Sequence, residues 1–243
     1  MQRAIDFISH WFSAKTRHGT HSPFIYEFVD QCIYRSKLSP HKELLKLFND
    51  LKKSNQIITG NDFGNDGQAS TKTVGYYAKT SSMLEFQARL LYRLVNYLKP
   101  NTILELGTNI GKSSAYMAAG NPHSKIVSVD GNKALCQFAQ KQHQKLGMNQ
   151  IQIFDAPFDS FLEELDQSFD FVFVDGNHHY EPTTKYFQFL KSKINGGGCM
   201  VFHDIYWSKG MKKAWDEIKK DQDVVISLDL FFFGIVSISC LFF

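Results

Sequence analysis

The chain has 243 residues, of which 43% are hydrophobic and 21% are charged, and its formal net charge is +3. This length suits one sizeable α/β domain with an appended element, and the composition excludes an intrinsically disordered chain. The small net charge and the scattered lysines do not require a nucleic-acid partner.

The N-terminal part, residues 1–52, has the hydrophobic periodicity of helices. Apolar side chains recur near helical spacing in residues 5–12 and again in residues 44–51. Between these segments, Ser22 and Pro23 are the residue types preferred at the N-cap and the first position of a further helix. We therefore expect helices here, before the first strand of the chain.

The turn before this further helix contains two histidines, His18 and His21. Neither has a metal-ligand partner at a recognisable fixed spacing. Two interpretations stay open: the histidines shape the turn, or they help to cover a substrate pocket.

Residues 55–82 are polar and rich in glycine, so they predict a long flexible loop that buries little surface. Loops of this length are usually functional lids or disordered links, and both interpretations stay open. We divide the chain into residues 1–82, a helical extension with a polar loop that caps a substrate site, and a second domain, residues 83–243.

Strand-like and helix-like segments alternate from residue 84 onward, which predicts an α/β fold with a doubly wound sheet. A first helix over 84–95 stops before Pro100. Strands are predicted at 102–106, 125–130, 150–154, 170–175 and 198–203, and helices at 112–119, 132–145, 157–165, 182–193 and 209–220. Two late strands are predicted near 223–229 and 231–239, because this apolar stretch is interrupted by polar residues and suits a sheet better than a membrane span.

The segment 102–114 contains a buried strand, a turn with glycines at 107 and 111, and the start of a helix. In a parallel sheet such a turn lies at the carboxyl edge, where ligands bind. Its spacing is not the G-x-G-x-x-G of dinucleotide sites, and Glu105 suits a ligand with a cationic amino-acid end. Asp130 ends the next strand, where it can accept hydrogen bonds from both hydroxyls of a ribose.

The stretch 105–111, Glu-Leu-Gly-Thr-Asn-Ile-Gly, resembles the class I S-adenosylmethionine-dependent methyltransferases, and within them the small-molecule O-methyltransferases typified by catechol and caffeoyl-coenzyme A enzymes. Residues 175–180, Asp-Gly-Asn-His-His-Tyr, are similar to the D-G-x-H-x-Y element of a broad set of such enzymes. A third motif leads from the glycines at 196–198 into His203 and Asp204. The resemblance covers roughly Phe86 to the C-terminus and implies a Rossmann-like, mostly parallel seven-stranded sheet with one antiparallel edge.

The resemblance also implies which residues bind S-adenosyl-L-methionine. In this interpretation Asp155 and Ala156 hold the adenine amino group and ring edge, although Asp155 could instead cap the following helix. The cofactor-binding set is Glu105, Gly107, Thr108, Gly111, Asp130, Asp155, Ala156 and Asp175.

Three residues are candidates for catalysis: His178, Asp175 and Asp204. His178 matches the family's D-G-x-H position and suits a general base, because an imidazole has an ordinary pKa of about 6.5; alternatively it orients Asp175. His203 is expected to point to the other side of its strand, into the core or behind the site.

Asp175 and Asp204 match two positions that bind a divalent cation in catechol-type relatives. Ile205 stands where those relatives have an Asn ligand, so we assign no metal ligand and expect magnesium, if used, to be weakly held. Tyr206 and Trp207 offer an aromatic wall to an acceptor or pack on the surface.

The sequence thus predicts an S-adenosylmethionine-dependent methyltransferase that acts on a small-molecule acceptor, at oxygen. Two alternatives remain: a catalytically inactive cofactor-binding regulatory protein, and an NAD-linked enzyme, against which the missing G-x-G-x-x-G argues. Cys32, Cys136, Cys199 and Cys240 are far apart and predict buried free thiols. With no signal-peptide pattern at the N-terminus, we expect a cytoplasmic monomer or homodimer.

Overall fold

The computed structural model describes residues 2–13, 23–34, 38, 40, 42–62 and 68–238. The expectations for His18, His21, Ser22 and Cys240 lie outside these residues. So do the middle of the predicted 55–82 loop and the end of the predicted strand 231–239.

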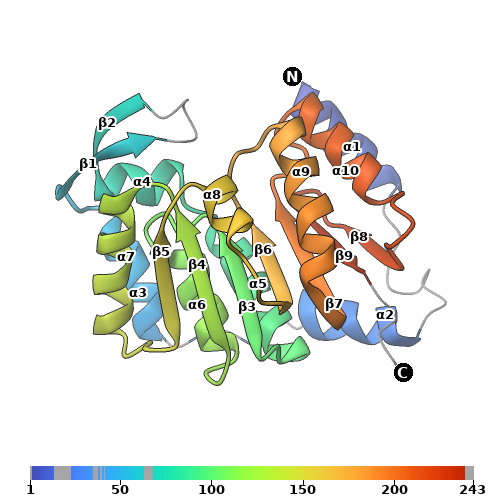
Figure 1. The fold of residues 1–243 in the computed structure, drawn as a ribbon, viewed down its shortest axis with the longest axis horizontal. Coiled ribbons are helices and arrows are strands. Elements are labelled where there is room, and N and C mark those ends of the chain that lie inside the picture. Colours follow the sequence, from blue (N-terminus) through green and yellow to red (C-terminus); the bar gives the residue numbers. More distant parts are fainter. Residues whose placement is uncertain are drawn as a thin grey trace.

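The structure is organised around a seven-stranded sheet, which confirms the doubly wound α/β fold (Figure 1). Its strands, in the spatial order β5-β4-β3-β6-β7-β9-β8, are β3 Thr102–Leu106, β4 Lys125–Asp130, β5 Ile151–Asp155, β6 Phe169–Val174, β7 Ile194–His203, β8 Ile226–Asp229 and β9 Phe233–Ser237. Strand β9 runs antiparallel to both β7 and β8. The expected antiparallel edge is therefore wrong in one detail, because the antiparallel strand lies next to the edge strand.

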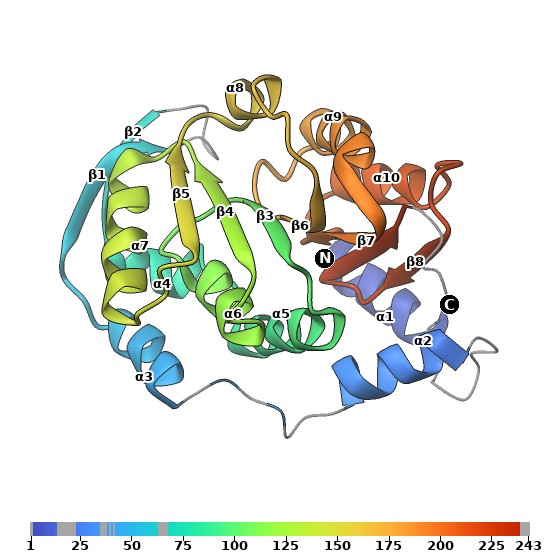
Figure 2. The ribbon, with the colours of Figure 1, turned by 60° about the horizontal axis from the view of Figure 1, so that its bottom comes forward.

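Helices cover both faces of this sheet. Figure 2 shows α5 and α6 on one side and α8, α9 and α10 on the other. The helices are α5 Glu85–Leu98, α6 Lys112–Gly120, α7 Lys133–Lys145, α8 Phe158–Glu163, α9 Tyr180–Leu190 with a 3-10 turn Lys191–Lys193, and α10 Lys209–Ile218. Every helix and strand predicted from residue 84 onward is present, with ends shifted by a few residues.

Local side-chain chemistry sets several helix ends. The Asn132 side chain accepts hydrogen bonds from the first turn of α7, including one from the Ala134 N–H at 3.1 Å. Ser208 caps α10 in the same way, accepting from the Met211 N–H at 3.1 Å. Helix α5 ends before Pro100, as predicted, because a proline cannot continue the helix.

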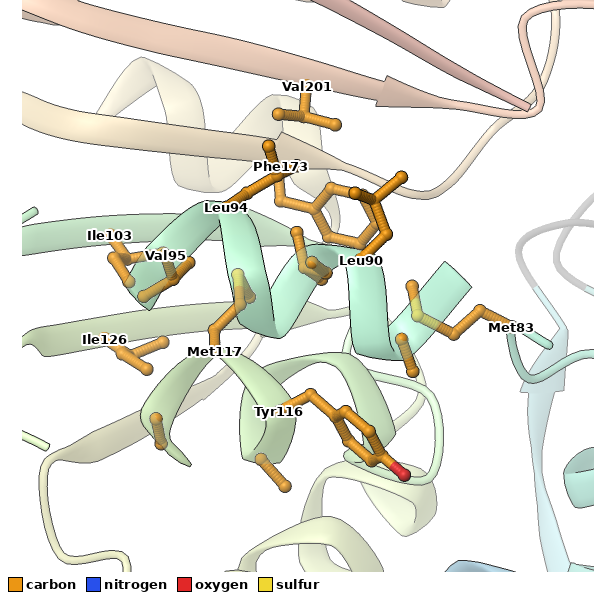
Figure 3. Packing of buried hydrophobic residues seen from close by; sticks show 14 of the residues in the cluster. Met83, Leu90, Leu94, Val95, Ile103, Tyr116, Met117, Ile126, Phe173 and Val201 are labelled. Atoms are coloured by element: carbon orange, nitrogen blue, oxygen red, sulfur yellow. The ribbon is translucent and has the colours of Figure 1, made fainter. Parts of the chain in front are cut away.

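Buried apolar side chains form two clusters, one on each face of the sheet. Successive side chains of β6 point to opposite faces of the sheet and so enter both clusters. Phe171 and Phe173 belong to the first cluster, and Val172 and Val174 to the second. Figure 3 shows the first cluster, where side chains of α5 and α6 meet those of the strands. A sheet buried on both faces explains why its parallel strands read as continuous apolar runs.

The N-terminal residues pack on the face that α5 and α6 cover (Figure 2). They form α1 Gln2–Ser13, α2 Pro23–Phe28 followed by a π-helical turn Val29–Tyr34, and α3 Lys42–Leu51. Phe28, Cys32, Leu44 and Phe48 are buried in the first cluster together with the side chains of α5. The predicted helices are confirmed, and residues 23–34 and α3 share their hydrophobic core with the sheet.

Helix α1 is attached differently, through polar contacts and through ring contacts such as that of Phe7 with Phe231. Asp6 forms an ion pair with Lys212 of α10 at 2.8 Å, and His10 Nε2 lies 3.0 Å from Asp229 Oδ1. The opposite side of α1 exposes large apolar side chains, among them Ile8 and Phe12, which are 56% and 84% exposed. The apolar periodicity of α1 therefore marks a solvent-facing stripe rather than a buried one.

The expected flexible loop over 55–82 is wrong for its described residues. Strands β1 Ile57–Asp62 and β2 Gln68–Thr73 pair as an antiparallel hairpin, and α4 Val74–Thr80 follows. Both strands carry β-branched residues, and Thr59 and Thr71 lie opposite each other with their hydroxyl oxygens 3.2 Å apart. The hairpin projects from the body of the protein (Figure 1), so its polar composition reflects exposure rather than lack of structure.

Cys32, Cys136 and Cys199 are buried free thiols, as predicted. The apolar stretch after residue 225 forms β8 and β9. Among the described residues we find no helix with the length and apolar character that crossing a membrane requires.

Candidate active site

A cavity of about 570 Å³ opens at the carboxyl edge of the parallel strands. This is the edge at which open α/β sheets bind ligands. Its lining includes Arg3, residues 79–84, Gly107, Asn109, residues 130–132, residues 157–159, residues 175–178, Tyr186, His203, Asp204 and Trp207. The strand ends and the N-terminal helical part thus enclose one common space.

The glycine turn after β3 needs both of its glycines, for different reasons. Gly107 lines the cavity with φ +112°, and a Cβ there would collide with the carbonyl oxygen of Asp175. Gly111 has φ +80°, and a Cβ there would lie 2.6 Å from His143 Nε2 of α7. Gly111 therefore serves the packing of α6 on α7 and is not part of the cavity lining.

Glu105 and Thr108 lie behind this turn rather than in the cavity lining. The Ser128 hydroxyl donates to Glu105 Oε2 at 2.5 Å, and Thr108 Oγ1 lies 2.6 Å from the same hydroxyl. Burial raises the pKa of Glu105 to about 8, although hydrogen bonds from nearby serines oppose the shift. Glu105 Oε1 has no hydrogen-bond partner among the described residues, so this carboxyl group supports the turn from inside the protein.

Asp130 is held rigidly at the end of β4. Its carboxylate accepts a backbone hydrogen bond from Asn109 through Oδ2 and one from Asn132 through Oδ1, each at 2.8 Å. Asn109 also donates to the carbonyl oxygen of Ser81 at 2.8 Å, which ties the glycine turn to the segment before α5. Asp130 therefore faces the cavity in a fixed orientation.

Asp155 and Ala156, the adenine candidates, do not line the cavity. The alternative that Asp155 caps α8 is not met either, because the N-cap of α8 is Pro157 and has no side-chain hydrogen bond. The residues that follow, Pro157, Phe158 and Asp159, do line the cavity.

Asp175, His178 and His203 form a connected group at the ends of β6 and β7. His203 Nδ1 lies 2.6 Å from Asp175 Oδ1, and His178 Nε2 lies 3.7 Å from the same oxygen. Burial opposes ionisation of Asp175, but the His203 imidazole outweighs it and lowers the pKa of Asp175 below its ordinary value. Despite its own burial, His203 has a raised pKa because of the Asp175 carboxylate, whereas burial lowers the pKa of His178.

The expectation that His203 points away from the site is wrong. Strands β6 and β7 pair with Val174 opposite Phe202, so the next residues, Asp175 and His203, lie side by side on one face of the sheet. Asp204 then turns back toward the same cavity because its backbone is left-handed, with φ +52°. The alternation of the strand stops at this residue.

Asp204 is paired with a residue from the other end of the chain. Arg3 Nη2 donates to Asp204 Oδ1 at 2.9 Å, and the Arg3 guanidinium lies 5.0 Å from the centre of a Trp207 ring. Arg3, Asp204 and Trp207 all line the cavity. No sequence pattern pointed to Arg3, because 201 positions separate it from Asp204. Tyr206 lies outside the lining and donates to Asp229 at 3.0 Å.

The residues present do not fit the magnesium site of catechol-type relatives. Asp204 is engaged by Arg3, and the side chain of Ile205 is only 1% exposed and belongs to the second core cluster. Asp175, His178 and His203 each offer one ligand atom within 4.8 Å of the others. Two imidazoles and one carboxylate suit a transition metal better than magnesium, which prefers oxygen ligands.

Comparison with known proteins gives two sequence matches. Residues 104–205 match a family model described as "Methyltransferase domain". An uncharacterized protein of Acanthamoeba polyphaga mimivirus is 26% identical over 135 residues, which cover 49% of this chain and 60% of that protein. The chain therefore spans less than two thirds of the length of this curated relative.

Solved structures with the same fold include several methyltransferases. An O-methyltransferase of tomaymycin synthesis from Streptomyces achromogenes, in complex with S-adenosylmethionine, is 17% identical, with a TM-score of 0.64 over 86% of this chain and 96% of that one. A methyltransferase from Podospora anserina with bound S-adenosylhomocysteine is 16% identical, with a TM-score of 0.64 over 91% of this chain and 100% of that one. At these identities the likeness establishes the fold.

Proposed function

Because residues 104–205 match a methyltransferase-domain model, within a fold shared with solved methyltransferases, we propose that the protein transfers the methyl group of S-adenosyl-L-methionine to an oxygen atom of a small-molecule acceptor. One observation carries the proposal. A single cavity brings together a glycine turn, a fixed strand-end carboxylate and a histidine–carboxylate group.

The cofactor half of the cavity is the half next to β3 and β4. Gly107 lines this half of the cavity, where we place the methionine part, and Asp130 offers oxygen acceptors to the ribose hydroxyls. Phe158 and Asp159 replace Asp155 and Ala156 as the residues nearest the adenine in our proposal. Bound there, S-adenosylmethionine supplies an electrophilic methyl group on a sulfonium sulfur.

The acceptor half is the half next to β6 and β7. His178 is our general base: burial lowers its pKa, so its imidazole is neutral near pH 7 and can take a hydroxyl proton. Asp175 lies 3.7 Å from His178 Nε2 and stabilises the imidazolium that proton removal creates. Holding the acceptor in line with the methyl group supplies on the order of 7–11 kcal/mol of the barrier, so the base adds to a large positioning effect.

The N-terminal helical part completes the acceptor side. Arg3 of α1 lines the cavity beside Asp204, and residues 79–82 line it beside the glycine turn, which supports our expectation that residues 1–82 cap the substrate site. The buried free thiols of Cys32, Cys136 and Cys199 are compatible with a reducing compartment, so we place the protein in the cytoplasm.

Two measurements test this proposal. Isothermal titration of the purified chain with S-adenosylhomocysteine should show one-site binding, and an S-adenosylmethionine radiolabelled on the methyl group should label acceptors from a panel of phenols, carboxylates and alcohols. Absence of binding would exclude a methyltransferase. Tight binding without transfer to any acceptor would favour the cofactor-binding regulatory protein instead.

A further inference from the structure

The two carboxylates at the ends of β6 and β7 are already paired with nitrogen groups of the chain itself. Asp175 Oδ1 is 2.6 Å from His203 Nδ1, and Asp204 Oδ1 accepts from Arg3 at 2.9 Å. In the catechol-type enzymes that the sequence resembles, the matching positions hold a divalent cation. Here Ile205, packed in the core, offers no third ligand.

Arg3 reaches this place from outside the methyltransferase domain. Its side chain is 44% exposed, lines the cavity and lies over a ring of Trp207. A guanidinium has five N–H donors in a planar fork, and among the described residues Asp204 accepts from one of its nitrogens, Nη2. The other donors can therefore serve a bound ligand, and an oxygen anion is the ligand that a guanidinium binds best.

We propose that Arg3 takes the place of the divalent cation of those relatives: it neutralises Asp204 and binds an acidic oxygen of the acceptor. Trp207 holds the guanidinium in place, since Arg3 lies over a ring of Trp207 and both side chains line the cavity. The acceptor class is therefore a small molecule that carries an acidic phenolic or carboxylic oxygen. This inference rests on the proposed function, because it concerns the acceptor half of the same site.

The experiment compares three variants. Arg3→Ala removes the charge, and Arg3→Lys keeps the charge without the planar fork. Lys212→Ala is the matched control, because the Asp6–Lys212 pair also fastens α1 to the body but Lys212 does not line the cavity. Circular dichroism and a thermal melt establish that each variant is folded.

The readout is binding of 3,4-dihydroxybenzoate, measured by titration calorimetry with the chain saturated by S-adenosylhomocysteine. Arg3→Ala should weaken this binding roughly 10- to 150-fold, the range for loss of a hydrogen bond to a charged group. Arg3→Lys should fall between Arg3→Ala and wild type, and Lys212→Ala should stay within about twofold. The affinity for S-adenosylhomocysteine should be the same in all four proteins, and excess chelator should not alter probe binding.

Four results would overturn the inference: unchanged binding in Arg3→Ala, an equal loss in Lys212→Ala, no binding of the probe by wild type, or a loss with chelator that magnesium restores. Failure of the proposed function looks different. In that case neither the wild-type chain nor any of the variants binds S-adenosylhomocysteine.

Discussion

Replacing Glu105 by Gln should remove one large pH dependence from the stability of this protein. Burial raises the pKa of this carboxyl group from an ordinary 4.5 to about 8, so the folded protein keeps it protonated while the unfolded chain ionises. The contribution of this carboxyl group to the stability of the folded state is fully present below pH 4.5 and is lost as the pH rises to 8. Each pH unit between these values lowers the free energy of unfolding by about 1.36 kcal/mol, which gives a loss of about 5 kcal/mol over the whole range.

Urea unfolding followed by circular dichroism at pH 5, 6.5 and 8 measures this effect. Near pH 5 the free energies of unfolding of Glu105→Gln and wild type should differ little. Between pH 5 and pH 8 the wild type should lose about 4 kcal/mol relative to the variant. The exposed Glu164 provides a control, since Glu164→Gln should track wild type at every pH. A difference between Glu105→Gln and wild type that is constant with pH would refute a neutral buried carboxyl group.

Three further predictions concern the cavity. Gly107→Ala should lower both the melting temperature and the affinity for S-adenosylhomocysteine. The new Cβ collides with the Asp175 carbonyl, and a non-glycine residue at this φ costs at least about 1 kcal/mol. An unchanged melting temperature and an unchanged affinity would contradict this prediction. Asp130→Ala should weaken S-adenosylhomocysteine binding by about 1.5–3 kcal/mol in a titration, and if it does not, the ribose is bound elsewhere. His178→Ala should lower single-turnover methyl transfer roughly 10²-fold, whereas excess chelator should lower wild-type activity less than about tenfold. Complete loss with chelator, restored by magnesium, together with a fully active His178→Ala, would make Asp175 and Asp204 cation ligands after all.

The sequence predicts the sheet well because its strands are buried on both faces. A run such as Phe171 to Val174 has no solvent-facing position, so its apolar character is continuous and easy to recognise. The buried strands also predict where Asp130 and Asp175 lie. A carboxylate at the end of a buried parallel strand has to lie at the carboxyl edge of the sheet, and both residues line the cavity there.

The errors have identifiable physical causes. The hairpin of β1 and β2 was predicted as a loop because polar residues and glycine dominate its sequence, although Ile58 of β1 is buried in the first core cluster. His203 was misplaced because strand alternation was extended by one residue too many, to Asp204, where the backbone turns left-handed. Arg3 gave no signal, because a contact that joins distant parts of a chain leaves no mark in local periodicity.

The polar attachment of α1 gives the two halves of the cavity different sensitivities to salt. Arg3 and Asp6 of this helix form ion pairs with Asp204 and Lys212, while Ile8 and Phe12 on its other side stay exposed. At physiological ionic strength the Debye length is already about 8 Å, and partly exposed pairs weaken further as salt is added. The glycine turn and Asp130 sit on a hydrophobic sheet that salt does not loosen. We therefore expect added salt to weaken the acceptor binding that we propose for Arg3 more than the cofactor binding that we propose for Asp130.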